Sequence, residues 1–92
     1  VPFKFDTVIT DVPEPWIFFE NNHINSNLYW VSYLPSISQV SKLADALQDN
    51  SFKDIEIKET IEREWTIRGN ISRPKHTMVG HTGFIVSGRY IL

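Results

Sequence analysis

The stretch TVITDVPEPW, residues 7–16, decides how this chain folds. Its first four residues are an apolar, β-branched run, which is typical of a strand covered on both faces. The strand ends in the carboxylate of Asp11, and the two prolines that follow stiffen the backbone around it. Open α/β sheets bind ligands at such strand ends. A rigid acid beside the indole of Trp16 suits a planar, hydrogen-bonding ligand such as a nucleobase. The alternative is a strand-to-helix turn in which Asp11 or Glu14 caps a helix.

A second strand follows a short helix and a turn. Residues 15–19 are predicted to open the short helix, with Pro15 in its first turn. The Asn-rich residues 21–27 have the composition of a turn. Residues 28–33 then form another buried strand, which ends in Tyr33.

The clearest helix start lies after this second strand. Ser36 is predicted to cap the helix, with Gln39 reaching back to it as in a capping box. Asn50 is the predicted end. One helical stripe of apolar residues marks this helix as part of the core. The stripe consists of Ile37, Val40, Leu43, Ala44 and Leu47.

The next segment, residues 54–67, has the alternation of a strand, although a helix competes. Its apolar residues all have odd numbers, which predicts one inward face interrupted by Glu59 and Arg63. These two opposite charges form an ion pair or mark a polar site. Residues 68–82 contain two glycines and a proline and are predicted to be a long loop, and residues 83–92 a last strand.

The predicted fold is therefore α/β, with right-handed crossovers between the first three strands and a last, antiparallel strand. Ninety-two residues make one small domain, residues 1–92. No apolar run approaches the roughly 20 residues of a membrane span, and no signal peptide opens the chain. Because the chain begins at Val1, already close to a strand, we expect it to be a piece of something longer.

Composition also limits the chemistry. The chain has no cysteine and three histidines, which argues against a zinc site. All eleven acids lie before Arg68, whereas Arg68, Arg73, Lys75 and Arg89 follow without an acid. This basic end contacts phosphates or is a solvated loop. No glycine-rich phosphate loop follows the first strand.

Two candidate site residues end neighbouring strands. Asp11 follows the first strand and Tyr33 ends the second. Because parallel strands share one rim at their carboxyl ends, we expect the two side chains to be neighbours if these strands pair. The alternatives are an amphipathic rim position for Tyr33 and a capping role for Gln39.

Several segments in order resemble the tRNA (adenine-N1)-methyltransferases that modify the T-loop, at position 58 of tRNA. The resemblance spans nearly all 92 residues and corresponds to the C-terminal half of that family. It rests on residues 11–16 (DVPEPW), 33–40 (YLPSISQV), 59–65 (with Glu59, Thr60, Arg63 and Trp65), 73–74 (RP) and 78–84 (MVGHTGF).

The family implies a Rossmann-like methyltransferase that uses S-adenosylmethionine. This chain would supply the fourth to seventh strands, in the spatial order 4-5-7-6, with strand 7 antiparallel to its neighbours. The N-terminal half of the family, which holds the cofactor, is absent. Asn25-Ser26-Asn27 stands where the family has a Gly-Gly turn. The resemblance also implies that tRNA is a partner. It implies either a homo-oligomer, a tetramer in the family, or an assembly with a catalytically silent sister subunit. The implied location is the cytoplasm or, in a eukaryote, the nucleus. No metal and no membrane are expected.

The resemblance assigns roles to particular residues. Asp11 and Tyr33 are the catalytic candidates, and Asp11 and Pro13 are the residues expected at the cofactor. The expected substrate-binding residues are Trp16, Gln39, Arg73, Lys75, His76, His81 and Thr82. Trp16 shapes a binding wall or belongs to the core, and the basic residues contact tRNA or another subunit. Two alternatives stay open: a non-catalytic tRNA-binding or oligomerisation module, and a methyltransferase with another substrate.

Overall fold

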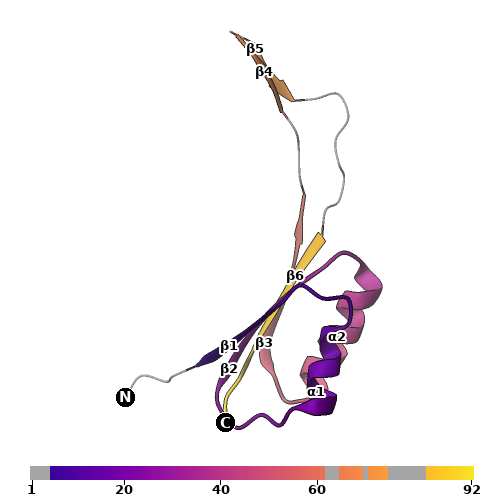
Figure 1. The fold of residues 1–92 in the computed structure, drawn as a ribbon, viewed down its shortest axis with the longest axis vertical. Coiled ribbons are helices and arrows are strands. Elements are labelled where there is room, and N and C mark those ends of the chain that lie inside the picture. The colour runs from indigo at the N-terminus through magenta and orange to yellow at the C-terminus, as the bar shows by residue number, and fades with distance from the viewer. Residues whose placement is uncertain (1–4, 62–64, 70, 75–82) are drawn as a thin grey trace.

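The chain folds into a twisted sheet with helices on one face and a two-stranded arm beyond it (Figure 1). The computed structural model describes residues 5–61, 65–69, 71–74 and 83–92. The elements in chain order are β1 (Asp6–Thr10), the 3₁₀ helix η1 (Pro15–Ile17), α1 (Phe18–Asn21), β2 (Leu28–Leu34), α2 (Ile37–Asp49), β3 (Lys53–Thr60), β4 (Trp65–Arg68), β5 (Ile71–Pro74) and β6 (Gly83–Tyr90).

The main sheet has the strand order β1-β2-β6-β3. β1 and β2 are parallel, with Thr10 opposite Ser32. β6 runs antiparallel to both of its neighbours, β2 and β3. The predicted order 4-5-7-6 and the antiparallel last strand are therefore confirmed, and the α/β fold is that of a Rossmann-like fragment.

One face of the sheet carries the core. Buried and exposed residues alternate along β2, because successive side chains of a strand point to opposite faces. Trp30 on the buried side lies against Phe18, Phe19 and Phe52, with ring centroids 5.1 to 6.1 Å apart. The buried hydrophobic residues of the described chain are Leu28, Trp30, Leu34, Val40, Leu43, Leu47, Phe52 and Val86.

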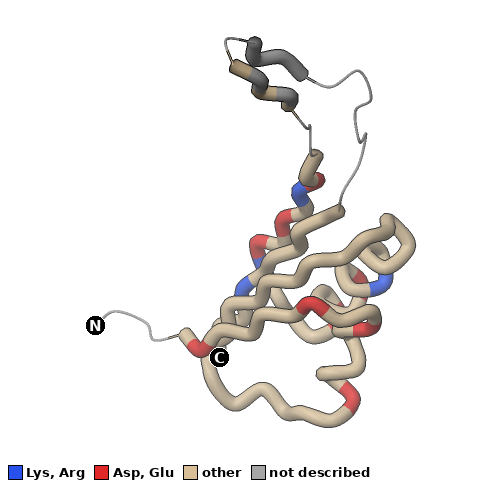
Figure 2. Tube along the Cα trace, turned by 45° about the horizontal axis from the view of Figure 1, so that its top comes forward, with Lys and Arg blue, Asp and Glu red and all other residues tan. Residues whose placement is uncertain are grey.

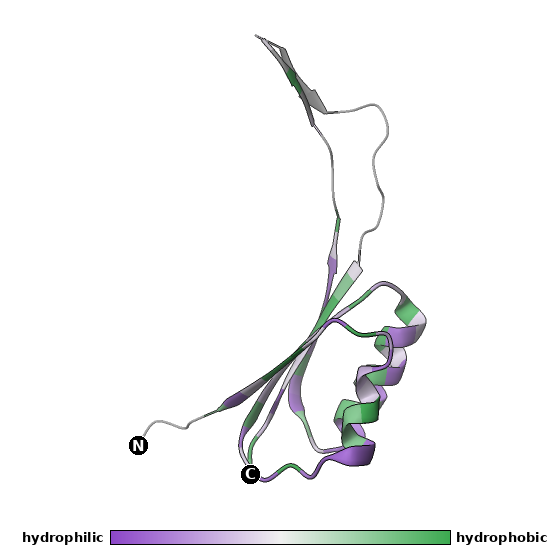
Figure 3. Ribbon diagram, in the orientation of Figure 1, coloured by the Kyte–Doolittle hydropathy of each residue, from purple (hydrophilic) through white to green (hydrophobic). Residues whose placement is uncertain are grey.

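Helix α2 covers this face through most of the predicted apolar stripe, but the first residue of that stripe, Ile37, is 63% exposed. Val40, Leu43 and Leu47 are buried, and Figure 3 shows hydrophobic and hydrophilic residues alternating around the helix. Ser36 is the N-cap as predicted, but the predicted capping box is wrong. The Ser36 hydroxyl caps no backbone N–H; it donates instead to the side-chain oxygen of Gln39, at 2.8 Å.

The region from residue 54 to 82 differs from the prediction. The strand expected to run to residue 67 ends at Thr60, and a separate strand, β4, begins at Trp65 within the predicted stretch. The supposed long loop contains the end of β4 and all of β5, which pair with each other. Gly69, with φ +57°, begins the turn between these two strands in the left-handed conformation that glycine tolerates best. The arm lies beyond the part of the sheet that the helices cover (Figure 1).

The predicted inward face of this segment is confirmed at Ile55, which packs against the core, but is wrong beyond it. Ile57, Ile61, Trp65 and Ile67 are all exposed, and Ile67 keeps 76% of its surface. In the part of the chain that the structure describes, no helix extends far enough to cover these four side chains. Charged residues gather along β3, as Figure 2 shows, whereas β2 has none. Within the described ranges, no helix is long and apolar enough to cross a bilayer.

Candidate functional site

A hollow of about 210 Å³ lies at the carboxyl ends of the parallel strands β1 and β2. The loop after β1 supplies Asp11, Val12 and Pro13 to its lining. Tyr33 comes from β2, Pro35 from the turn that follows β2, and Gln39 from the first turn of α2. The pairing of β1 with β2 thus brings Asp11 and Tyr33 to one hollow, as their positions in the sequence predicted.

Asp11 is exposed at this hollow. Its carboxylate makes no hydrogen bond or ion pair with any residue that the structure describes. A carboxylate with all its acceptor capacity open to a hollow is suited to receive N–H donors from a ligand. Glu14 is the N-cap residue of η1, as the helix-capping alternative predicted, but neither its side chain nor that of Asp11 makes a capping hydrogen bond.

Tyr33 lies on the open face of the sheet, opposite to the helices, and is 38% exposed. Its ring lies close against Gly83, the first residue of β6. A Cβ atom at Gly83 would overlap the phenol ring and its hydroxyl oxygen. The absence of a side chain at Gly83 therefore fixes where the Tyr33 ring can lie.

Gln39 joins the loop after β1 to helix α2. Its amide nitrogen donates to the backbone carbonyl of Pro13 at 3.0 Å, and its oxygen accepts the Ser36 hydroxyl. Sequence reasoning missed this contact, because it joins residues 26 positions apart and depends on how the helix packs against the sheet.

A buried hydrogen-bond chain lies on the strand side of the same loop. The Trp30 indole nitrogen donates to the Ser32 hydroxyl at 2.7 Å, and that hydroxyl lies 2.5 Å from the hydroxyl of Thr10. Ser32 is fully buried, and it is the buried polar residue of the described core. This series of hydrogen bonds ends at Thr10, one residue before Asp11.

The remaining predicted site residues do not line this hollow. Trp16 lies partly buried between η1 and α2, where the Lys42 ammonium sits 5.4 Å from the centre of its ring. The backbone of Arg73 belongs to β5 in the arm. The predictions for Lys75, His76, His81 and Thr82 fall outside the described residues, as does that for Arg63. The structure thus groups Asp11, Pro13, Tyr33 and Gln39.

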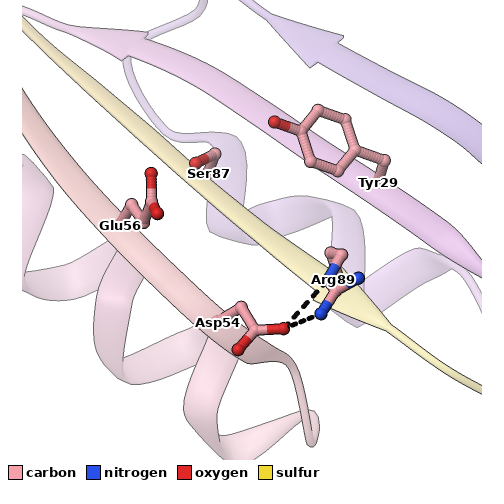
Figure 4. Close-up of a pocket in the computed structure, with 5 residues that line it drawn as sticks. All are labelled: Tyr29, Asp54, Glu56, Ser87 and Arg89. Carbon is pink, nitrogen blue, oxygen red and sulfur yellow. Dashed lines mark hydrogen bonds and ion pairs between the residues drawn. The ribbon is translucent and has the colours of Figure 1, made fainter.

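A second hollow, of about 310 Å³, lies on the open face of the sheet (Figure 4). Arg89 donates through both Nε, at 2.9 Å, and Nη2 to one oxygen of Asp54, and Tyr29, Glu56 and Ser87 complete the lining. Sequence reasoning missed this pair, because it depends on the irregular register of β3 against β6. The Asp54 carboxylate is already paired with a cation, unlike that of Asp11.

The Asp11 hollow has the chemistry of a site for a flat, amino-bearing ring. Val12, Pro13 and Pro35 supply apolar walls, the Tyr33 ring supplies an aromatic surface, and Asp11 supplies a hydrogen-bond acceptor. In the part of the chain that the structure describes, no three His, Cys, Asp or Glu residues come together as metal ligands.

Comparison with known proteins supports the same interpretation. Residues 1–71 match the family described as "tRNA methyltransferase complex GCD14 subunit". The tRNA (adenine(57)-N(1)/adenine(58)-N(1))-methyltransferase TrmI of Methanocaldococcus jannaschii is 39% identical over 89 residues, which are 91% of this chain and 31% of the relative. The tRNA (adenine(58)-N(1))-methyltransferase TrmI of Thermus thermophilus is 34% identical over 87 residues, 92% of this chain and 34% of the relative.

Two solved structures share the fold. A SAM-dependent O-methyltransferase from Thermotoga maritima aligns with a TM-score of 0.74 and 25% identity, over 95% of this chain and 34% of that protein. The tRNA (m1A58) methyltransferase TrmI from Aquifex aeolicus aligns with a TM-score of 0.64 and 29% identity, over 94% and 35%. The chain thus spans about a third of the length of the relatives that it matches.

Proposed function

Because this chain belongs to the tRNA methyltransferase family of the GCD14 subunit, we propose that it is part of a tRNA (adenine-N1)-methyltransferase that modifies adenine 58 of the T-loop. Residues 1–92 would form the C-terminal part of the catalytic domain. The observation that carries the proposal is the hollow in which Asp11, with no partner among the described residues, lies with Tyr33 at the ends of the parallel strands.

The reaction needs a base held by its amino edge. N1 of neutral adenine carries a free lone pair, so no proton has to leave before this nitrogen attacks. When bound, S-adenosylmethionine would supply the methyl group to N1, with its sulfonium sulfur as the leaving group, and the adenine ring would gain a positive charge. The Asp11 carboxylate accepts a hydrogen bond from the N6 amino group, which becomes more acidic as that charge develops, and so favours the transition state.

The other residues of the hollow position the base. The Tyr33 ring stacks on the adenine or donates through its hydroxyl, and the proline walls exclude water. The target nucleotide has to leave the base stack of the T-loop to reach Asp11.

The residues present fit one wall of a cofactor site. The open Asp11 carboxylate is an acceptor for the cofactor or for the base, and Pro13 shapes the adjoining surface. The carbonyl of Pro13 is occupied by Gln39, so Pro13 acts there through its ring. The rest of the cofactor site would come from the two thirds of the relatives' length that this chain does not span.

The arm and the basic end of the chain would serve tRNA and assembly. Arg73, Lys75, His76, His81 and Thr82 would contact tRNA phosphates or a neighbouring subunit. The exposed Ile61, Trp65 and Ile67 favour a homo-oligomer, such as a tetramer, or an assembly with a silent sister subunit. The enzyme would work where tRNA is processed, in the cytoplasm or, in a eukaryote, the nucleus.

The proposal is tested with the complete protein that contains these residues. The protein is incubated with S-adenosylmethionine and a tRNA transcript, and the nucleosides are analysed by mass spectrometry. We expect N1-methyladenosine at position 58, and none in a transcript with guanosine at that position. Tight tRNA binding without any methyl transfer would instead favour a non-catalytic module.

A further inference from the structure

The backbone that carries Asp11 is held on both sides by side-chain hydrogen bonds, and we propose that Gln39 is a positioning residue for this carboxylate. The inference rests on the proposed function and extends it: Gln39, which also lines the hollow, acts through the loop that carries the acid. This replaces the predicted role of Gln39 in substrate binding.

Both ends of the Gln39 amide make hydrogen bonds within the protein. The Ser36 hydroxyl donates to its oxygen at 2.8 Å, which turns the nitrogen toward the loop. The nitrogen then donates to the carbonyl of Pro13 at 3.0 Å. The oxygen and one N–H of Gln39 are thus engaged within the protein, which suits a structural link better than contact with a ligand.

The Pro13 carbonyl that Gln39 binds lies close to Asp11 along the chain. Pro13 lies two residues after Asp11, in a loop without regular secondary structure. On the other side of Asp11, Thr10 is held by the buried hydroxyl of Ser32 and through it by the Trp30 indole. The short segment from Thr10 to Pro13 is therefore held by a hydrogen bond at each end.

No side-chain hydrogen bond to a described residue holds Asp11 itself. Its carboxylate has no partner among the described residues, so only the backbone and its own rotamer determine where it lies. If the Pro13 link is cut, the prolines still restrict φ, but no other hydrogen bond between described residues joins residues 11–14 to α2. The next contact with α2 is then that of Trp16 with Lys42. Misplacing a catalytic group by about 1 Å can cost 10²-fold in rate.

The test compares Gln39→Met with Gln39→Lys in the complete protein. Methionine removes the donor while keeping the length of the side chain, and lysine restores a donor that reaches the Pro13 carbonyl. We expect Gln39→Met to lower kcat about tenfold or more, with KM for tRNA within about twofold, and Gln39→Lys to recover much of that loss.

The thermal stabilities of the two variants should rank in the opposite order to their activities. Both residues are good helix formers, but a cation in the first turn of α2 is unfavourable, so Gln39→Lys should unfold at the same or a lower temperature than Gln39→Met. An activity order that follows thermal stability would overturn the positioning role. Gln48→Met and Gln48→Lys are the matched controls, because Gln48 is exposed on the same helix and no part of the hollow. Equal losses of activity at positions 48 and 39 would also overturn it.

A direct measurement separates this inference from the proposed function. The backbone amide resonance of Val12 should shift in Gln39→Met, return toward its wild-type position in Gln39→Lys, and stay unchanged in Gln48→Met. An unchanged Val12 resonance in Gln39→Met would overturn the positioning role. A wild-type protein that methylates no tRNA would overturn the proposed function alone.

Discussion

Tyr33 keeps its ring beside the Asp11 hollow because Gly83 has no side chain to exclude it. We expect Gly83→Ala to force the ring out of place and to lower methyl transfer to about the level of Tyr33→Ala. The double variant should lose little more than either single one, because both changes act on the same ring. Methyl-transfer rates of the three variants measure this coupling.

Gly88→Ala is the matched control on the same strand. A Cβ atom there would meet Ile55 at 3.4 Å, an ordinary contact distance, so we expect near-normal activity. Additive losses in the Gly83→Ala and Tyr33→Ala pair would show that Gly83 does not act through the tyrosine.

Strand β1 lies at the edge of the main sheet in the described chain, with Ile9 76% exposed. Open apolar edges promote association between chains. We therefore expect the isolated 92-residue chain to self-associate as its concentration rises, and Ile9→Lys to reduce this association. Sedimentation velocity measures both.

Ile91→Lys provides the comparison, since it makes the same substitution at an exposed isoleucine outside the strands. An isolated chain that stays monomeric at every concentration would contradict the prediction, as would equal effects of the two lysines.

How well each element could be predicted depended on the range of the interactions that define it. The helical stripe of α2 and the apolar runs of β1 and β2 are local patterns, and all three elements lie where the sequence places them. β4 was not separated from β3, and β5 was missed, because β4 and β5 have only four residues each, too few for a periodic signal. The predicted burial of Ile57, Ile61, Trp65 and Ile67 was wrong because a strand pattern cannot tell whether a helix covers its face.

The site followed the same rule. Asp11 and Tyr33 could be grouped from sequence, because the ends of paired parallel strands meet by geometry alone. The links from Gln39 to Pro13 and from Ser32 to Thr10 could not, because they depend on side-chain rotamers and on the packing of α2.

As a whole, the molecule presents one wall of the proposed methyl-transfer site. The chain spans about a third of the relatives that it matches, and the Asp11 hollow encloses only about 210 Å³. We therefore expect the isolated chain to bind S-adenosylmethionine weakly or not at all in isothermal titration calorimetry. Micromolar binding would contradict this expectation and would mean that these residues form a cofactor site by themselves.

The most direct test of the account is the methyl-transfer rate of Asp11→Ala in the complete protein, with Glu14→Ala as the matched control. Both acids are exposed and three residues apart, but only Asp11 lines the hollow with Tyr33. A hydrogen bond to developing charge contributes roughly 2.7–4 kcal/mol, so Asp11→Ala should lower kcat by about 10²–10³-fold. We predict this loss with nearly unchanged tRNA affinity and with Glu14→Ala close to wild type. Near-normal turnover by a folded Asp11→Ala protein would contradict the account.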